Sequence, residues 1–344
     1  MNSRERVLAA IHIEEPDRVP FSVGLHPDLA KEITGGDDEL LAQKIGGDIL
    51  TVGETEPAGW KPKRFKDGTW VDEWGILRNP RVPGTIDWFE SHPISKPEDL
   101  ESYEFPDPYA PGRFDALDRA VKENRGRLCL FFGLGWTLFE RSWLLYGFEN
   151  LLRDMHSNPR FVERLMDRIV EYDLEILKQG LERDVDVCHF GDDFGSRKGP
   201  LMSPLLWRRY IKPRLEKLFE IPKRKGLPIG IHSDGNITAL IPDLVEIGVR
   251  IINPVSPIEV DPVWLKDMFG DRVCMYGTMD IHRTMPFGTP SDVEREVLER
   301  MRTVGCGGGL IIYSRSELAD TPAENILALV EAVKRHGKYA CRAL

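Results

Sequence analysis

The chain has 344 residues, of which 41% are hydrophobic and 30% charged, and its formal net charge is −10. This acidic balance argues against a nucleic-acid backbone or an anionic membrane surface as a partner. No apolar run reaches the roughly 18 residues that a membrane span requires, and charges interrupt the amino-terminal segment where a signal peptide would be apolar. We therefore expect a cytoplasmic globular protein.

The first 18 residues place apolar and charged side chains at helical spacing, which predicts a short amphipathic helix. After it, short apolar runs rich in β-branched residues each end at a glycine or a polar residue, as the buried strands of a parallel sheet do. These eight predicted strands are 19–23, 49–52, 128–132, 185–190, 228–231, 250–252, 273–276 and 310–313.

Segments of helical period lie between the predicted strands, at 159–184, 204–225, 237–247, 290–304 and 322–336. The clearest begins at Asn158 and Pro159, which supply the cap and the first-turn proline. Strands that alternate with helices through short connections form right-handed crossovers, and eight of them close a barrel. The sequence therefore predicts a single-domain (β/α)₈ TIM barrel over residues 1–344.

Residues 60–108 have a different composition, rich in Gly, Pro, Trp and Asp. Within them KDGTWV at 66–71 predicts a hairpin turn. We expect an inserted hairpin and loop region after the second strand, which covers part of the barrel mouth.

The cysteines predict no disulfide framework, because their number is odd, they lie far apart and none belongs to a C-x-x-C motif. We expect buried free thiols at Cys129, Cys188, Cys274, Cys306 and Cys341.

Active sites of TIM barrels are built from the residues that follow each strand. In this chain polar side chains crowd these positions, which predicts one shared site. The residues are His26, Glu54, Trp136, Glu140, Arg141, Asp192, Asp193, His232, Asp234, Asn236, Asn253, Asp280, His282 and Arg315.

Each of these residues also has a structural interpretation. Asp234 and Asn236 are suited to cap the helix that follows, and His232 comes directly after an apolar strand, as a core histidine would. One of Asp192 and Asp193 is expected to hold its loop by accepting bonds from backbone amides.

His232 and Asp234 both follow the end of the same predicted strand. An imidazole and a carboxylate are side chains that bind zinc. A third ligand is needed, and either Asp193 or Glu54 is a candidate because the spacing does not distinguish them. Trp136 has two interpretations, the floor of a pocket or a seal over the core.

Ordered motifs run along the chain: RERVLAA at 4–10, PDRVP at 16–20, GLGWTL at 133–138, DDFG at 192–195, GPLMSP at 199–204, HSDGN at 232–236 and TPAENI at 321–326. Together they resemble the uroporphyrinogen decarboxylase superfamily over nearly the whole chain. The resemblance implies the same barrel that the strands predict. It also matches Asp48, in GDIL at 47–50, to the catalytic aspartate of the decarboxylases.

The superfamily contains decarboxylases and cobalamin-dependent methyltransferases, and departures from its motifs favour the second branch. True uroporphyrinogen decarboxylases bind a polycarboxylate tetrapyrrole through arginines after the first strand, where this chain has LHPDLA at 25–30, and they carry Tyr at the position of Arg141. Without those arginines a polyanionic substrate is not neutralised.

Thiol-using methyltransferases of this superfamily bind zinc through a His-x-Cys and a later Cys. At these positions the chain has His232-x-Asp234 and Arg315. A thiolate-rich site is therefore not expected. A harder metal site, or a metal-free acid site using Asp193 and His232, takes its place.

The resemblance thus implies a methyltransferase that moves a methyl group from a small methylated substrate, such as a methoxylated aromatic, to a corrinoid protein, with zinc as the candidate metal. The expected catalytic residues are Asp193, His232, Asp192 and Asp48, and the expected substrate-binding residues are Trp136, Arg141, Arg315, His26, Tyr276 and His282. Trp70 and Trp74 are expected as apolar walls, and the two arginines suit a substrate carboxylate.

Two alternatives stay open. One is a decarboxylase acting on a tetrapyrrole or a smaller carboxylic acid, and the other is a corrinoid- or tetrapyrrole-binding protein without catalysis. The oligomeric state is also open, a homodimer included.

Overall fold

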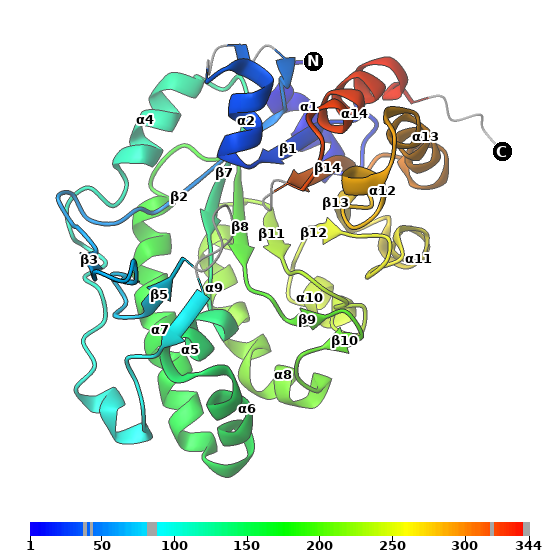
Figure 1. The fold of residues 1–344 in the computed structure, drawn as a ribbon. Coiled ribbons are helices and arrows are strands. Elements are labelled where there is room, and N and C mark those ends of the chain that lie inside the picture. The colour runs from blue at the N-terminus through cyan, green and yellow to red at the C-terminus, as the bar shows by residue number, and fades with distance from the viewer. Residues whose placement is uncertain (37–39, 42–43, 81–87, 317–319, 340–344) are drawn as a thin grey trace.

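Eight parallel strands form the central sheet of the protein, in the order β1-β14-β13-β12-β11-β8-β7-β2 (Figure 1). The computed structural model describes residues 1–36, 40–41, 44–80, 88–316 and 320–339. The two ends of the sheet meet where the backbone N–H of Asp48, directly before β2, donates to the carbonyl of Phe21 in β1. The sheet is therefore nearly closed, and the predicted (β/α)₈ barrel is confirmed.

The barrel strands begin within two residues of their predicted starts and extend one to three residues beyond their predicted ends. They are β1 Phe21–Leu25, β2 Ile49–Gly53, β7 Cys129–Leu134, β8 Val187–Gly191, β11 Ile229–His232, β12 Ile251–Val255, β13 Cys274–Thr278 and β14 Leu310–Ser316. The extension has a physical reason, because backbone pairing continues where the side chains turn polar. Gly24, for example, still pairs with Arg315.

Helices surround the barrel and cover the outer face of its strands (Figure 1). Their bounds are α1 Ser3–Ile11, α2 Pro27–Thr34, α4 Asp115–Asn124, α5 Phe139–Tyr146, α6 Phe148–Ser157, α7 Pro159–Gly180, α8 Pro204–Tyr210, α9 Lys212–Arg224, α10 Ile241–Glu246, α11 Pro262–Phe269, α12 Thr284–Phe287, α13 Pro290–Arg300 and α14 Ala323–His336. The described residues also form a 3₁₀ helix, η1 Pro97–Glu101, and a π turn, η2 Met301–Gly305.

Two predicted helices are shorter or divided because of prolines. The segment at 204–225 forms α8 and α9, since Pro213 lies in the first turn of α9 and has no N–H with which to continue α8. The segment at 237–247 becomes helical only at Ile241, and Pro242 occupies its first turn.

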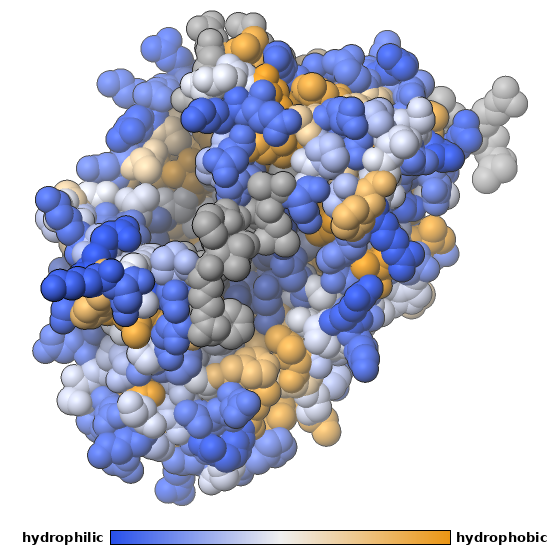
Figure 2. All heavy atoms as spheres, in the orientation of Figure 1, coloured by the Kyte–Doolittle hydropathy of each residue, from blue (hydrophilic) through white to orange (hydrophobic). Residues whose placement is uncertain are grey.

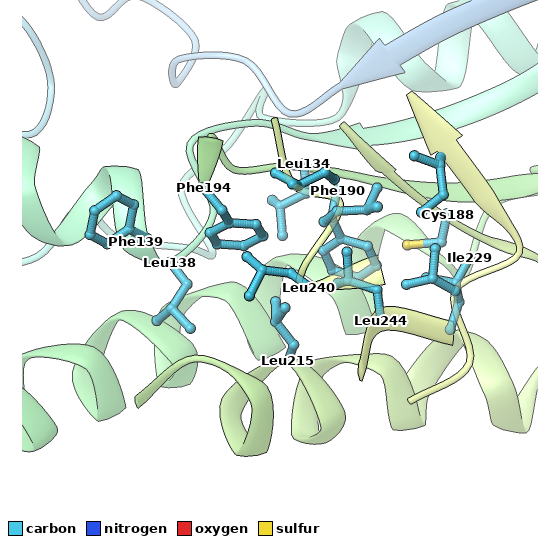
Figure 3. Packing of buried hydrophobic residues seen from close by; sticks show 14 of the residues in the cluster. Leu134, Leu138, Phe139, Cys188, Phe190, Phe194, Leu215, Ile229, Leu240 and Leu244 are labelled. Atoms are coloured by element: carbon cyan, nitrogen blue, oxygen red, sulfur yellow. The ribbon is translucent and has the colours of Figure 1, made fainter. Parts of the chain in front are cut away.

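Side chains of the strands alternate between two hydrophobic clusters. Leu130 and Phe132 point outward to the helices, whereas Cys129 and Phe131 point into the barrel. Figure 3 shows the outer layer, in which side chains of β8 and β11 contact those of α9 and α10. The inner cluster includes Val7 of α1, so this helix closes the amino-terminal end of the barrel. The carboxyl end of the strands is not covered by this helix.

Between β2 and β7 the chain forms a small antiparallel sheet in the order β3-β4-β5-β6. Its strands are β3 Lys63–Arg64, β4 Trp70–Val71, β5 Leu77–Asn79 and β6 Trp88–Ser91. A turn joins β3 to β4, in which the N–H of Phe65 donates to the carbonyl of Thr69. The interpretation of 60–108 as an insertion stays a prediction, and part of it, 81–87, lies outside the described residues. A second short hairpin follows β8, with β9 Gly195–Ser196 and β10 Gly199–Pro200.

Three of the five cysteines are buried free thiols as predicted: Cys129, Cys188 and Cys274. Cys306 is disulfide-bonded, so the prediction of a free thiol is wrong there. Cys341 lies outside the described residues.

In the part of the chain that the structure describes, no helix combines the length and the apolar character that crossing a bilayer requires. Hydrophilic side chains cover most of the face drawn in Figure 2, and a group of hydrophobic side chains gathers over α8, where Leu205 is exposed.

Candidate active site

Two neighbouring cavities open at the carboxyl ends of the barrel strands. The first, the mouth cavity, has a volume of about 590 Å³, and the polar side chains that line it include Glu140, Asp193, His232, Asp234 and Arg315. The second, the side chamber, has a volume of about 530 Å³ and lies beside the antiparallel sheet. Gly133, Gly135 and Trp136 line both cavities, so the two adjoin at the end of β7.

Asp193, His232 and Asp234 bring three ligand atoms together in the mouth cavity. His232 Nε2 lies 3.8 Å from Asp193 Oδ1 and 3.7 Å from Asp234 Oδ1. The loop after β8 is tied to the loop after β11, because the backbone N–H of Asp234 donates to Asp193 Oδ1 at 2.7 Å. The two loops named in the sequence therefore converge at one site.

Asn253 of β12 orients the imidazole of His232. Its Oδ1 lies 2.7 Å from His232 Nδ1, and its own amide N–H₂ donates to the carbonyl of Tyr276. That second bond turns the amide oxygen toward the histidine, so Nδ1 carries the proton in the neutral ring. The lone pair of Nε2 consequently faces Asp193 and Asp234.

Arg315 of β14 supplies positive charge to the cluster. Its Nη2 donates to Asp234 Oδ2 at 2.6 Å, and its Nη1 lies 3.4 Å from His232 Nε2. Because Arg315 uses Oδ2 of Asp234, the Oδ1 atom that faces the imidazole is left for another partner.

Carboxyl groups in this cavity have raised pKa values. Burial, with the charge of Asp234, raises the pKa of Asp193. Burial, with the charges of Asp193 and Asp192, raises the pKa of Glu140 to about 9. The ionised forms of these carboxyl groups are therefore disfavoured, and a cation bound beside them would favour ionisation.

Asp192 does not face the mouth cavity. Its carboxylate is buried and accepts three backbone hydrogen bonds, from the N–H groups of Leu138, Phe139 and Glu140. These are the unsatisfied donors at the start of α5, which a carboxylate complements. Of the two adjacent aspartates, Asp192 thus holds the loop, and its expected catalytic role is corrected to a positioning one.

Asp48 lies at the opposite end of the barrel. It precedes β2, so the length of the strand, about 17 Å at roughly 3.3 Å per residue, separates it from the mouth. Its buried carboxylate accepts bonds from Arg6, Arg18 and the backbone N–H of Phe21. The expectation of a catalytic Asp48 is corrected, because side chains at the start of a strand face the end that α1 closes.

His26 and His282 line neither cavity. His26 caps α2 by accepting the N–H of Asp28. The side chain of His282 is 45% exposed and lies 3.6 Å from Glu259. Neither is placed to bind a substrate in the two cavities, which corrects that expectation.

Tyr276, Trp136 and Arg141 do line the cavities. Tyr276 belongs to the mouth cavity and Arg141 to the side chamber. Trp136 stands between them, 39% exposed, with a φ of 47° that a tryptophan rarely adopts. Backbone strain of this kind persists only where the surroundings impose it, often at a binding site.

Glu54 belongs to the side chamber, not to the cluster around His232. It accepts a bond from the hydroxyl of Tyr172 and pairs with Arg113. Of the two candidates for a third metal ligand, only Asp193 therefore lies beside His232 and Asp234.

Two lining residues were absent from the predicted site, His189 and Tyr313. They point inward from β8 and β14, and the Nε2 atom of His189 is buried without a hydrogen-bond partner. Strand alternation would have indicated His189 and Tyr313, because residues that alternate with outward-facing ones must face the barrel interior.

The donor set fits zinc. One imidazole nitrogen and two carboxylate oxygens lie within 4.8 Å of one another, and three protein ligands with an open position are typical of catalytic zinc. The bond from His232 Nδ1 to Asn253 is the outer-shell contact that zinc-binding histidines make. Asp193, His232 and Asp234 would hold the ion.

The chain is similar to known proteins both in sequence and in fold. Residues 82–336 match the family described as uroporphyrinogen decarboxylase (URO-D). Two similar curated proteins, both named uroporphyrinogen decarboxylase, come from Geobacter sulfurreducens (24% identical, covering 90% of this chain and 85% of that protein) and Chlorobium luteolum (25%, covering 91% and 86%). Among solved structures, a methyltransferase from Methanosarcina mazei has the same fold, with a TM-score of 0.75, 20% identity and coverage of 97% of this chain and 99% of that chain.

Proposed function

The chain belongs to the uroporphyrinogen decarboxylase family of enzymes, and this family also contains methyltransferases. We propose that the chain is a methyltransferase. It moves a methyl group from a small methylated substrate, such as a methoxylated aromatic, to a corrinoid protein. The observation that carries the proposal is the cluster of Asp193, His232 and Asp234 at the open mouth of the barrel. The likeness in fold to a methyltransferase agrees with it.

Demethylation requires activation of a poor leaving group. Cleaving an ether or amine methyl needs the heteroatom protonated or bound to a Lewis acid while the reduced corrinoid, as the methyl acceptor, attacks in line. Zinc, when held by the cluster, supplies that Lewis acid. Without zinc, the carboxylic acid form of Asp193 or the imidazolium form of His232 would deliver the proton to the heteroatom, so the residues of the proposal do not change.

Neighbouring side chains orient the imidazole and the carboxylate of the cluster. Asn253 keeps the Nε2 lone pair of His232 toward the cluster, and Arg315 holds Asp234 and balances its charge. The wall formed by Tyr276 and Tyr313, whose ring centroids are 4.9 Å apart, gives the mouth cavity an apolar side. An apolar wall with a few polar groups is typical of a site for a small organic molecule.

A decarboxylase is the second candidate, favoured by the names of the curated relatives. Two observations weigh against it. The mouth cavity contains one arginine among its described residues, and Arg78 and Arg113 of the adjoining side chamber are already paired with carboxylates, which leaves too few arginines for a polycarboxylate. Asp48, matched to the decarboxylase aspartate, lies at the far end of the barrel.

The test is incubation of the purified protein with a reduced corrinoid protein and a panel of methoxylated and methylated compounds. We expect the absorbance spectrum of methylcobalamin to appear with at least one donor. His232→Ala and Asp193→Asn should abolish it, whereas the matched control His282→Ala, outside both cavities, should not.

Other outcomes contradict the proposal. Release of carbon dioxide from a carboxylic acid, without methyl transfer, would assign the decarboxylase. Ligand binding that survives His232→Ala, with no turnover of any compound, would assign the non-catalytic binding protein. Elemental analysis should find about one zinc per chain, and its absence from an active preparation would assign the metal-free form of the site.

A further inference from the structure

The side chamber contains a buried arginine, Arg141, that forms no ion pair with any described residue. Arg141 of α5 is 6% exposed, and no hydrogen bond or ion pair joins its guanidinium to another described residue. Its Nη1 atom is fully buried without a hydrogen-bond partner. A buried charge without a partner is costly, and proteins keep one mainly where a ligand compensates it.

The other charged groups of the chamber are paired among themselves. Arg78 donates to Asp72 at 2.7 Å, and Arg113 pairs with Glu73 and Glu54. Asp72 also accepts bonds from the backbone N–H groups of Trp74 and Ile76. Asp72 and Glu54 attract Arg141 from a distance, but among the described residues neither forms a hydrogen bond or ion pair with it.

Asp173 attracts Arg141 but forms no ion pair or hydrogen bond with it. It is buried, and its Oδ2 atom also lacks a hydrogen-bond partner. Burial raises the pKa of Asp173 well above its usual value, against the attraction of Arg141.

Arg141 lines the side chamber, and its guanidinium packs against an aromatic ring. Its guanidinium lies against the ring of Trp74, with 3.8 Å from Cζ to the ring centroid, and 5.7 Å from the centroid of Trp136. Contact with an aromatic face fixes the plane of the guanidinium. Its N–H donors lie in that plane, where they match the two oxygens of a carboxylate.

We propose that the side chamber is a subsite for one carboxylate group of an organic substrate, which Arg141 binds. A single unpaired cation matches a monocarboxylate, and Trp136, exposed between the cavities, provides a flat apolar surface for the rest of the molecule. The substrate then spans both cavities, with its carboxylate at Arg141 and its reacting end beside His232. This inference depends on the proposed function only for the statement that the reacting end of the substrate lies beside His232.

Gly135 keeps the passage between the cavities open. A Cβ atom added there would meet nothing within 4 Å, and the residue lines both cavities. A larger side chain at this position would therefore enter the passage without disturbing packing.

Carboxylate binding can be measured by calorimetry without any methyl acceptor. Benzoate, 3-phenylpropanoate and hexanoate are the probes, each compared with its neutral amide. We expect at least one acid to bind more tightly than its amide, and Arg141→Met to weaken it about 30-fold, as expected from loss of a charge-assisted pair. His282→Ala, outside both cavities, is the control and should change this affinity less than threefold, whereas Arg315→Met tests the other candidate for the carboxylate.

Arg141→Met also separates a binding role from a structural one. Methionine keeps the contact with Trp74 and removes an unpaired buried charge, so the melting temperature should stay the same or rise. Gly135→Leu should retain binding of these short acids but weaken a methoxylated acid long enough to reach both cavities.

The inference is overturned if no acid binds better than its amide, if Arg141→Met binds like the wild type, if Arg315→Met is the variant that loses binding, or if Arg141→Met melts at a markedly lower temperature. A failure of methyl transfer with carboxylate binding intact would instead count against the proposed function alone.

Discussion

A substitution at Asp48 tests whether the position of a residue in the structure, or its match to a family motif, identifies the catalytic residues of this protein. The resemblance matches it to a catalytic aspartate, whereas the structure places it, fully buried, where β2 begins. Asp48→Asn keeps the shape of the side chain and removes its charge. If the geometry is correct, the variant loses stability and keeps the chemistry of the mouth cavity.

The size of the loss follows from the partners. Breaking a buried ion pair by removing one charge costs about 3–5 kcal/mol. The lower end applies here, because Arg6 keeps its bonds to Asp17 and the side chain of Arg18 is 21% exposed. Unfolding entropy of about 2.1 cal/mol/K per residue amounts to about 0.7 kcal/mol/K for this chain length. A loss of about 3 kcal/mol therefore lowers the melting temperature by about 4 °C.

Scanning calorimetry measures the melting temperature, and zinc content with methyl transfer reports on the site. Asp17→Asn is the matched control, since Asp17 also pairs with Arg6 but is 44% exposed, and it should lower the melting temperature by about 1 °C. An Asp48→Asn protein that melts like the wild type yet has lost turnover would refute the reasoning, because Asp48 would then act on the substrate.

Three further predictions concern individual contacts. Asn253→Ala removes the oxygen that orients His232, and zinc affinity measured by chelator competition should fall about 10- to 100-fold without a large change in melting temperature. Asp192→Asn turns an N–H₂ group toward backbone donors of α5, so denaturant titration should find a loss of about 1–3 kcal/mol, with zinc content kept. The bond from Arg6 lowers the pKa of Asp17, so this carboxylate stabilises the fold above its unfolded pKa of about 4 and the contribution is lost as the pH falls further. Melting temperatures of wild type and Asp17→Asn should therefore converge between about pH 5 and pH 2, and a constant difference would contradict this.

Much of the candidate site could be predicted from the order of residues along the chain. In a parallel barrel all strands run the same way, so residues that follow strands must meet at one end. This rule places Asp193, His232, Asp234 and Arg315 at a common mouth, although they lie in three different loops and strands. The same rule, applied strictly, excludes Asp48, which precedes its strand.

Other assignments depended on which way a side chain turns after its strand. Asp192 and Asp193 are adjacent and chemically identical, yet one accepts the amides of α5 and the other faces His232. Likewise Glu54 and Arg141 both follow strands but turn into the side chamber. Loop backbone and the packing of α5 decide these directions, and neither leaves a pattern in the local sequence.

The sequence by itself determined the barrel, because apolar runs of strand length separated by helices bury their surface in few other ways. Only the tertiary structure decided that the barrel mouth has two cavities rather than one, and that no described residue forms a hydrogen bond or ion pair with the guanidinium of Arg141 in the second. Pairing of charges is a long-range property: Arg113 finds Glu73 40 residues away, and Arg315 finds Asp234 81 residues away. Which charge stays unpaired becomes defined only when all of these partners have been brought together.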